Sequence, residues 1–368
     1  MVAMLINLLP EDAGSAATPK DFSQVTRFVF IPSRTAPVVT VIDADSDRVA
    51  GMLDSIIVPG QIIVSEAAKR LVAMDGVEKH IAILDLASGN ATTFDLAFTP
   101  RRLVAASDGY MIAAADLAGG TIGFVDLMHG RVTSLITGLS EIRDLMFGAD
   151  GAFLYVAADG LKGLGVVDVA RGKLIEDIAI PDWVPGNVSG LTRAPNGRAG
   201  YLKAQDGLIN VIDLNNFRLL RRVEAAQGAP KVFPTGFGRY LVVPNNADHT
   251  LTVLANASLS IAAMMNGPSD MATVYSGWFD TAALVPSPAE RKLLIYDLDR
   301  LALAASISLP GRPGLGAVTP DGAKFYLVLE DSGSVAVFDL KTRRLTKSIP
   351  VGPDPGAAVM AKSFDICH

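Results

Sequence analysis

Short apolar runs, ending in aspartate in all but one case, recur along almost the whole of the 368-residue chain. Their last positions are 41 to 45 residues apart. The eight runs are Val38–Asp43, Ile81–Asp85, Ile122–Asp126, Leu164–Asp168, Leu208–Asp213, Leu251–Ala255, Leu293–Asp297 and Val335–Asp339. Eight copies at a nearly constant period indicate one supersecondary unit that is repeated eight times.

Each repeat has the pattern of four short strands, and the last complete repeat is the clearest. The apolar run Leu315–Val318 is followed by the turn Pro320-Asp321-Gly322, and then by the hydrophobic run Phe325–Leu329. The strand Val335–Asp339 and the alternating strand Leu345–Pro350 complete the unit. Short strands at such spacing, separated by glycine and proline, are typical of the blades of a β-propeller.

The two ends of the chain predict how the ring closes. The first repeat starts at Arg27–Pro32 and lacks an inner strand, whereas the C-terminal segment Gly356–Lys362 resembles an inner strand with nothing after it. We therefore expect an all-β, eight-bladed β-propeller of four-stranded blades, closed by the C-terminal strand joining the first blade. The expected organisation is an N-terminal extension (1–25), one propeller domain (26–363) and a C-terminal tail (364–368).

The repeated aspartates could form a ring of carboxylates, but a structural role explains them better. Each stands at the end of a strand, where an aspartate side chain can accept hydrogen bonds from backbone N–H groups of the following turn. The seven residues are Asp43, Asp85, Asp126, Asp168, Asp213, Asp297 and Asp339.

Composition agrees with blades that are buried on both faces, because half of the residues are hydrophobic and only 19% are charged. The net charge of −6 argues against a nucleic-acid partner. A single cysteine excludes an internal disulfide. The apolar run Val2–Leu9 is too short to cross a membrane and lacks the positive region of a secretory signal. We expect a monomer without membrane insertion.

Residues with catalytic or metal-binding chemistry are few, and no catalytic residue is predicted. The four histidines show no metal-ligand spacing, so neither a metal site nor a cofactor is expected. The C-terminal Cys367-His368 is similar to the end of a haem c attachment motif, but Phe364 occupies the position of the first cysteine. A frayed terminus is the preferred interpretation, and haem attachment through a single thioether is the alternative.

The repeats resemble the YVTN-type family of bacterial β-propellers, over residues 26–362. The resemblance depends on Pro320-Asp321-Gly322, Tyr326, Val335–Asp339 and Pro350-Val351-Gly352; Tyr155-Val156-Ala157-Ala158 is the nearest copy of the family's tetrad. Related propellers act as binding modules, as periplasmic chaperone-like proteins and as parts of redox enzymes such as amine dehydrogenases. The resemblance thus implies a periplasmic or cell-envelope location, while a shared fold does not transfer a function.

Propellers usually bind ligands at a funnel mouth, formed by the loops that enter the inner strands and those between the second and third strands. The candidate mouth residues are Arg101, Arg143, Asp144, Trp183, Asn187, Lys231, Asp270 and Arg312. Trp183 could anchor a ligand or partner, or it could pack on an adjacent blade. Arg101, Arg143 and Arg312 could converge on an anion, or they could simply line a solvated channel.

Three hypotheses for the function follow. The absence of catalytic motifs favours a non-catalytic propeller that binds an unidentified small molecule or protein partner at its mouth. The first alternative is a propeller subunit of an envelope redox system, which the family resemblance implies. The second is a metal-dependent, lactonase-like hydrolase, for which Asp144, Asn187 and Asp270 are the plausible oxygen ligands.

Overall fold

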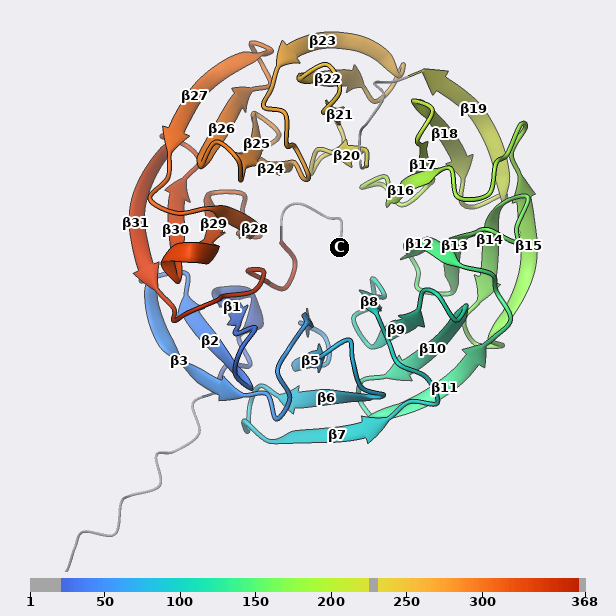
Figure 1. Ribbon diagram of the computed structural model, residues 1–368, viewed down its shortest axis with the longest axis horizontal. Helices are drawn as coiled ribbons and strands as arrows, with labels where there is room; N and C mark the ends of the chain where they lie inside the picture. Colours follow the sequence, from blue (N-terminus) through green and yellow to red (C-terminus); the bar gives the residue numbers. More distant parts are fainter. Residues whose placement is uncertain (1–20, 225–230, 364–368) are drawn as a thin grey trace, which may run out of the picture.

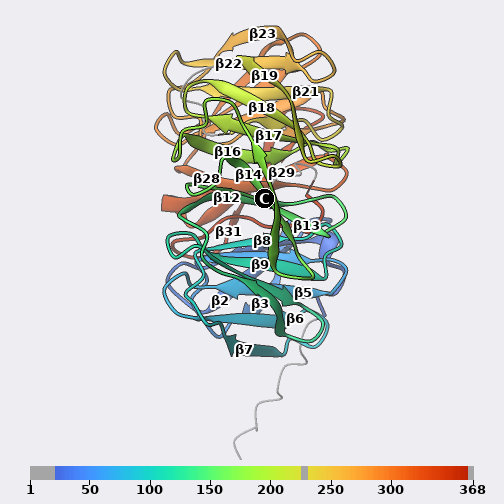
Figure 2. The same cartoon turned by 90° about the vertical axis from the view of Figure 1, so that its right-hand side faces the viewer.

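The computed structural model describes residues 21–224 and 231–363, which form eight antiparallel sheets arranged as the blades of a ring (Figure 1). Seven sheets have four strands, and the sheet of the first blade has three, β1 to β3. Seen from the side, the ring is a disc (Figure 2). Two single-turn 3-10 helices, η1 (Val25–Arg27) and η2 (Glu330–Ser332), interrupt the strands. The predicted all-β, eight-bladed β-propeller is therefore confirmed.

Within each blade, the strands lie side by side in order from the centre of the ring to its rim. The inner strands are β4 (Gln61–Ser65), β8 (Arg102–Ala105), β12 (Ile142–Phe147), β16 (Val188–Arg193), β20 (Phe233–Pro234), β24 (Tyr275–Gly277) and β28 (Pro313–Val318). The second strands are β1 (Phe28–Pro32), β5 (Arg70–Met74), β9 (Met111–Asp116), β13 (Phe153–Ala158), β17 (Ala199–Ala204), β21 (Tyr240–Asn245), β25 (Ala282–Ser287) and β29 (Lys324–Leu329).

The third strands are β2 (Val38–Asp43), β6 (His80–Asp85), β10 (Thr121–Asp126), β14 (Gly163–Asp168), β18 (Leu208–Asp213), β22 (Thr250–Ala255), β26 (Lys292–Asp297) and β30 (Ser334–Asp339). The outer strands are β3 (Arg48–Asp54), β7 (Ala91–Asp95), β11 (Arg131–Ile136), β15 (Lys173–Ala179), β19 (Arg218–Glu224), β23 (Ser260–Asn266), β27 (Ala302–Ser308) and β31 (Arg344–Pro350).

The ring closes where the C-terminal segment pairs with the first blade, as predicted. The backbone of Val359 exchanges two hydrogen bonds with Phe30 on β1, with N–O distances of 2.8 and 3.0 Å. The Gly356 N–H donates to the Pro32 carbonyl at 2.7 Å. The pairing consists of two isolated bridges, Phe30 with Val359 and Ser33 with Pro355, instead of a continuous ladder. The first blade thus receives its inner strand from the other end of the chain.

Hydrophobic side chains fill the interfaces between neighbouring blades. The described residues contain eight buried apolar clusters, and each cluster joins residues of two adjacent blades. The cluster at the closure joins Ile42 of blade 1, Tyr326 of blade 8 and Ala358 of the C-terminal segment. Phe22 and Val25, which precede the predicted start of the propeller, are buried in the cluster between blades 1 and 2. Burial on both faces of every sheet explains the nearly continuous apolar runs of the sequence.

The repeated aspartates have the predicted structural role. Each of the seven carboxylates accepts at least one hydrogen bond from a backbone N–H of the turn that follows its strand. In blade 1, for example, Asp43 accepts from the N–H groups of Asp45 and Ser46 at 2.9 and 3.2 Å. The aspartate therefore recurs because it stabilises the same turn in each of these blades.

Among residues 21–224 and 231–363, no helix is both long enough and apolar enough to span a bilayer. The C-terminal Cys367-His368 lies outside the described residues, as does the segment Val2–Leu9.

Candidate functional site

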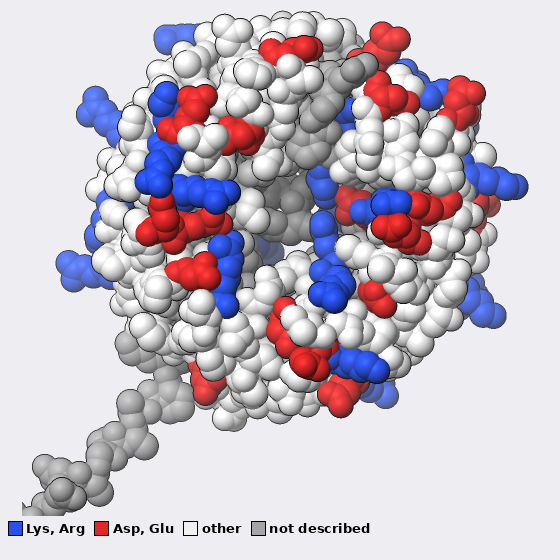
Figure 3. All heavy atoms as spheres, viewed as in Figure 1, with Lys and Arg blue, Asp and Glu red and all other residues white. Residues whose placement is uncertain are grey.

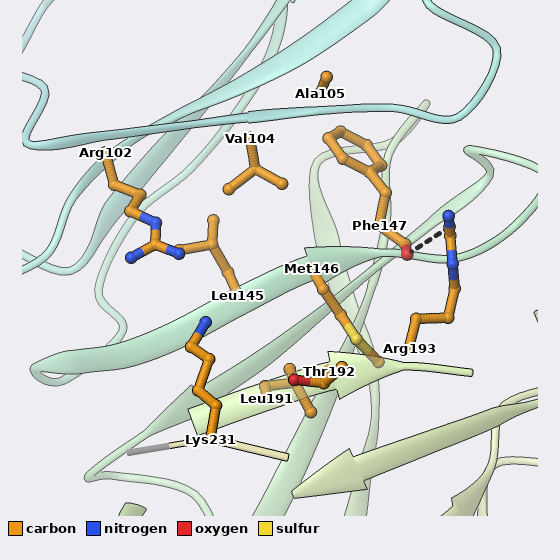
Figure 4. Close-up of a pocket in the computed structure, with 10 residues that line it drawn as sticks. All are labelled: Arg102, Val104, Ala105, Leu145, Met146, Phe147, Leu191, Thr192, Arg193 and Lys231. Atoms are coloured by element: carbon orange, nitrogen blue, oxygen red, sulfur yellow. Dashed lines mark hydrogen bonds between the residues drawn. The ribbon is translucent and has the colours of Figure 1, made fainter. Parts of the chain in front are cut away.

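A small pocket lies among the inner strands of blades 3, 4 and 5, where β8, β12 and β16 stand next to one another (Figure 4). Its volume is about 50 Å³, enough for a group of a few atoms. Apolar side chains such as Val104 and Leu145 line it together with three basic residues, Arg102, Arg193 and Lys231. Lys231 precedes β20, so the wall of the pocket extends to blade 6.

Asp144 is the buried carboxylate beside this pocket, with only 4% of its surface exposed. A register shift in β12 between Ile142 and Asp144 changes the strand's alternation at this point. The Asp144 carboxylate accepts hydrogen bonds from the Leu145 N–H at 2.9 Å and from the Leu191 N–H of β16 at 2.8 Å. Asp144 thereby ties the inner strands of blades 4 and 5 together.

Two basic side chains from other blades approach the same carboxylate. Lys231 Nζ lies 2.8 Å from Asp144 Oδ2, and Arg102 Nη2 lies 3.5 Å from Asp144 Oδ1. Figure 4 shows Arg102 and Lys231 extending toward each other. Both side chains are about one-third exposed, so they keep contact with solvent at the centre of the ring.

Arg193 lies at the opposite end of the pocket, with its guanidinium group against the Phe147 carbonyl (Figure 4). Its Nη1 atom donates to this carbonyl at 2.9 Å and to Ser107 Oγ at 2.7 Å. The pocket and its wall thus combine three positive charges with the single negative charge of Asp144. Such an arrangement can hold an anionic group.

The space-filling view places these charges in context. Figure 3 shows Lys and Arg side chains along much of the rim of the central opening, with Asp and Glu side chains mainly further out on the same face. The centre of this face is therefore more basic than its surroundings, although the whole chain carries a net charge of −6. The basic side chains at the opening can attract an anionic group there.

Of the candidate mouth residues, the structure brings Asp144 and Lys231 together. Arg101 is exposed beside β8, and it is its neighbour Arg102 that reaches Asp144. Arg143 and Arg312 instead contact acidic residues of their own blades. Their role as ligand-binding residues stays a prediction.

Four candidate residues share one kind of contact. Each lies in the loop that enters an inner strand or at the start of that strand, and each contacts the end of the second strand or the loop that follows it in the same blade. The pairs are Arg143 with Asp159, Asn187 with Asp206 at 3.2 Å, Asp270 with Ser287 at 2.6 Å, and Arg312 with Glu330 at 3.8 Å. The hydrogen bond from Arg143 lowers the pKa of the Asp159 carboxyl. These contacts hold adjacent loops of a blade together.

Trp183 packs against the apolar cluster between blades 4 and 5. This contact corresponds to the structural one of the two predicted alternatives. The neighbouring Asp182, in a left-handed conformation with φ of 56°, pairs with Arg222 of β19 at 3.2 Å. Two contacts thus attach the loop to blade 5: the ion pair between Asp182 and Arg222, and the packing of the Trp183 ring.

The three residues of the hydrolase hypothesis, Asp144, Asn187 and Asp270, contact different groups in the structure. Within residues 21–224 and 231–363, no cluster of three or more His, Cys, Asp or Glu side chains could hold a metal ion.

Arg193 was not among the residues singled out from the sequence. It stands at the C-terminal end of the inner strand β16, whereas the candidate residues were expected in the loops. No periodic signal marks it, because the register shifts in β12 and β16 alter which side chains reach the pocket.

The fold and the pocket define the class of this protein as an eight-bladed β-propeller with a basic pocket among its inner strands. No family model matches the sequence, and no curated protein matches it. Among solved structures, it is similar to the dihydro-heme d1 dehydrogenase NirN in complex with DHE, with 15% identity, a TM-score of 0.77, and coverage of 96% of this chain and 78% of NirN.

Two further structures are similar over shorter spans or with lower scores. Apo AztD from Citrobacter koseri has 17% identity and a TM-score of 0.68, covering 90% of this chain and 97% of AztD. Hydrazine synthase from Kuenenia stuttgartiensis has 20% identity and a TM-score of 0.54, covering 70% of this chain and 88% of that one. Likeness at these identities shows the fold alone. The YVTN-type assignment stays a prediction.

Proposed function

We propose that this protein is a non-catalytic binding propeller that holds a carboxylate or phosphate group of a small molecule in the pocket between Arg102, Arg193 and Lys231. The observation that carries the proposal is the convergence of two cations, Arg102 of blade 3 and Lys231 of blade 6, on the buried Asp144 beside a pocket that Arg193 of blade 5 also lines. Side chains that far apart in sequence meet only at the centre of the ring.

The role of Asp144 in this proposal is to position the cations. Its oxygens already accept two backbone N–H groups, and Arg102 and Lys231 each approach one oxygen. A guanidinium group has five N–H donors and an ammonium group has three, so both cations keep donors for a ligand. The pocket volume of about 50 Å³ suits an acidic group, with the rest of the ligand extending into the central opening.

Calorimetric titration with inorganic phosphate and with succinate tests the proposal. Arg102→Gln and Lys231→Met should each weaken binding about tenfold or more, because each removes a charge-assisted hydrogen bond. Lys173→Gln, on the exposed strand β15, is the matched control and should bind like the unaltered protein. Binding that is equally strong in all three variants would refute the proposal, as would the absence of binding to both anions.

A second candidate, a propeller subunit of an envelope redox system, is favoured by the names of two similar structures, a dehydrogenase and a hydrazine synthase. The resemblance to YVTN-type propellers supports the envelope location in both cases. Purification from the periplasmic fraction of the native cells, followed by native mass spectrometry and an absorption spectrum, separates the candidates. A coloured partner or prosthetic group favours the redox system, and a colourless protein with an anionic small molecule favours the binding propeller.

A further inference from the structure

Three buried polar atoms without a hydrogen-bond partner lie in the interface between blades 4 and 5. Among the described residues, only four buried side-chain nitrogen or oxygen atoms lack such a partner. Three of them are Trp183 Nε1, Asn210 Oδ1 and Arg222 Nε, and the fourth belongs to Asn245 in blade 6. Three of four such atoms in one interface point to a common cause.

Strand pairing brings two of these side chains together. Asn210 on β18 and Arg222 on β19 are direct cross-strand partners, so both side chains project from the same face of blade 5. Ile212, two residues after Asn210, belongs to the apolar cluster that blade 5 shares with blade 4. Side chains two residues apart on a strand share a face, so Asn210 and Arg222 face blade 4.

The mouth loop brings Trp183 to the same interface. Trp183 packs against the cluster that contains Ile212, and the adjacent Asp182 pairs with Arg222 at 3.2 Å. Asn210 is 2% exposed, and its Nδ2 group donates to the Leu202 carbonyl at 3.3 Å. The amide orientation is thereby assigned, which leaves Oδ1 as the free acceptor.

The chemistry of the three atoms defines what would satisfy them. The indole Nε1–H and the guanidinium Nε–H are donors, and the amide oxygen is an acceptor. An unsatisfied buried polar group is costly, and native proteins usually satisfy such groups with an internal water that makes about three hydrogen bonds. A water oxygen accepts two hydrogen bonds and donates through its own hydrogens, which matches two donors and one acceptor.

We propose that the interface between blades 4 and 5 contains a site for one internal water molecule, which accepts from Trp183 Nε1–H and Arg222 Nε–H and donates to Asn210 Oδ1. This water attaches the mouth loop 181–187 to the middle of blade 5. The loop leads directly into β16, which supplies Leu191 and Arg193 to the pocket. The water therefore helps to position one wall of the pocket, and its existence does not depend on the proposed ligand.

The test uses the indole N–H groups, because the chain contains only two tryptophans, Trp183 and Trp278. In the full chain labelled with 15N-tryptophan, Trp183→Phe assigns the two indole signals. We expect a cross-relaxation peak between a water proton and the indole N–H proton of Trp183. Its sign should be the one that a long-lived bound water gives. The indole N–H proton of Trp183 should exchange with solvent at least about tenfold more slowly than the indole N–H proton of Trp278.

Matched substitutions at position 210 probe the acceptor. Asn210→Leu removes it at similar volume and should abolish the cross-peak, whereas Asn210→Asp keeps an acceptor oxygen and should retain it. A high-resolution crystal structure of the unaltered protein gives a readout that does not depend on how the variants fold. The proposal is overturned if that structure shows a direct hydrogen bond among the three side chains, or if the Trp183 signal has no water contact.

Discussion

The turn after each third strand shows how a single side chain stabilises a blade. In seven blades an aspartate accepts backbone N–H groups of this turn, but in blade 6 the position is Ala255. The turn of blade 6 has a similar backbone, with Leu259 in the left-handed conformation (φ 56°) as Phe217 is in blade 5 (φ 50°). Blade 6 therefore has the same turn without the aspartate side chain that accepts backbone N–H groups, which we call the cap.

Removing one cap should destabilise the protein. Asp213 accepts from the backbone of Asn215 and Asn216, both at 3.1 Å, and from Asn216 Nδ2 at 2.8 Å. We expect Asp213→Ala to lower the free energy of unfolding by about 1–2 kcal/mol, because two or more hydrogen bonds are lost. Urea denaturation measures the change. Ala255→Asp is the reciprocal variant and should raise stability by up to about 1 kcal/mol; a decrease there would contradict the capping role.

Lys203 is a second residue whose environment has a measurable consequence. Its side chain on β17 is fully buried, and Nζ donates to the Ala204 carbonyl at 2.5 Å. Burial lowers the pKa of the Lys203 ammonium to about 8, while the negative charge of Asp206 acts in the opposite direction. The folded protein therefore holds this proton less tightly than the unfolded chain does.

The lowered pKa gives a pH dependence with a definite sign. Between pH 8 and the ordinary lysine pKa of 10.5, the unfolded chain binds more protons, so stability should rise with pH across this window. Lys203→Met removes the ionisable group and should be more stable than the parent at pH 7 by about 1–3 kcal/mol, with a smaller difference at pH 9.5. Chemical denaturation at both pH values measures this. Lys173→Met, at an exposed position, should show no such dependence, and an unchanged difference for Lys203→Met would contradict the assignment.

At the scale of the elements, the closure between blades 8 and 1 is the contact on which the ring depends. Exposed ion pairs connect the loops across it, with Arg34 pairing to Glu330 at 2.9 Å and to Asp354 at 3.4 Å. Exposed pairs of this kind contribute about 0–1 kcal/mol each. The backbone hydrogen bonds of Val359 and the apolar cluster around Ala358 should therefore contribute more to the closure.

Blocking one of these backbone bonds tests the relative contributions. Val359→Pro removes the N–H that donates to the Phe30 carbonyl at 3.0 Å and should cost about 3 kcal/mol, seen as a lower Tm. Val359→Ala keeps the hydrogen bond and serves as the control. Arg34→Gln should cost less than about 1 kcal/mol. If Arg34→Gln were the more damaging substitution, the ion pairs and not the strand pairing would hold the ring closed.

At the scale of the whole molecule, the pocket exists only because blades 3 to 6 pack side by side around the centre of the ring. Arg102, Asp144 and Lys231 come from blades 3, 4 and 6, and none of them is a sequence neighbour of the others. The proposed binding role therefore belongs to the assembled propeller and to no single repeat. Substitutions at the closure should reduce anion binding only as far as they unfold the ring.

The mouth contacts explain which candidate residues could be anticipated. Loop positions followed from the repeat, so Asp144, Lys231 and Trp183 could be selected from the sequence. The engagement of Arg143 by Asp159 and of Arg312 by Glu330 could not, because the two loops of one blade meet only after its strands have paired. From the sequence, Arg143 and Arg312 are expected to act together with Arg101, whereas the structure brings Arg102 to the pocket.

The periodic pattern by itself determined the number of blades, the order of their strands, the turn role of the aspartates and the way the ring closes. These properties are local or repeat at a constant spacing, so each copy supports the others. Only the tertiary structure decided which charges meet at the pocket and which polar atoms are buried between blades 4 and 5. Those outcomes depend on single register shifts, such as the one before Asp144, and on contacts between different blades, which a repeating pattern does not encode.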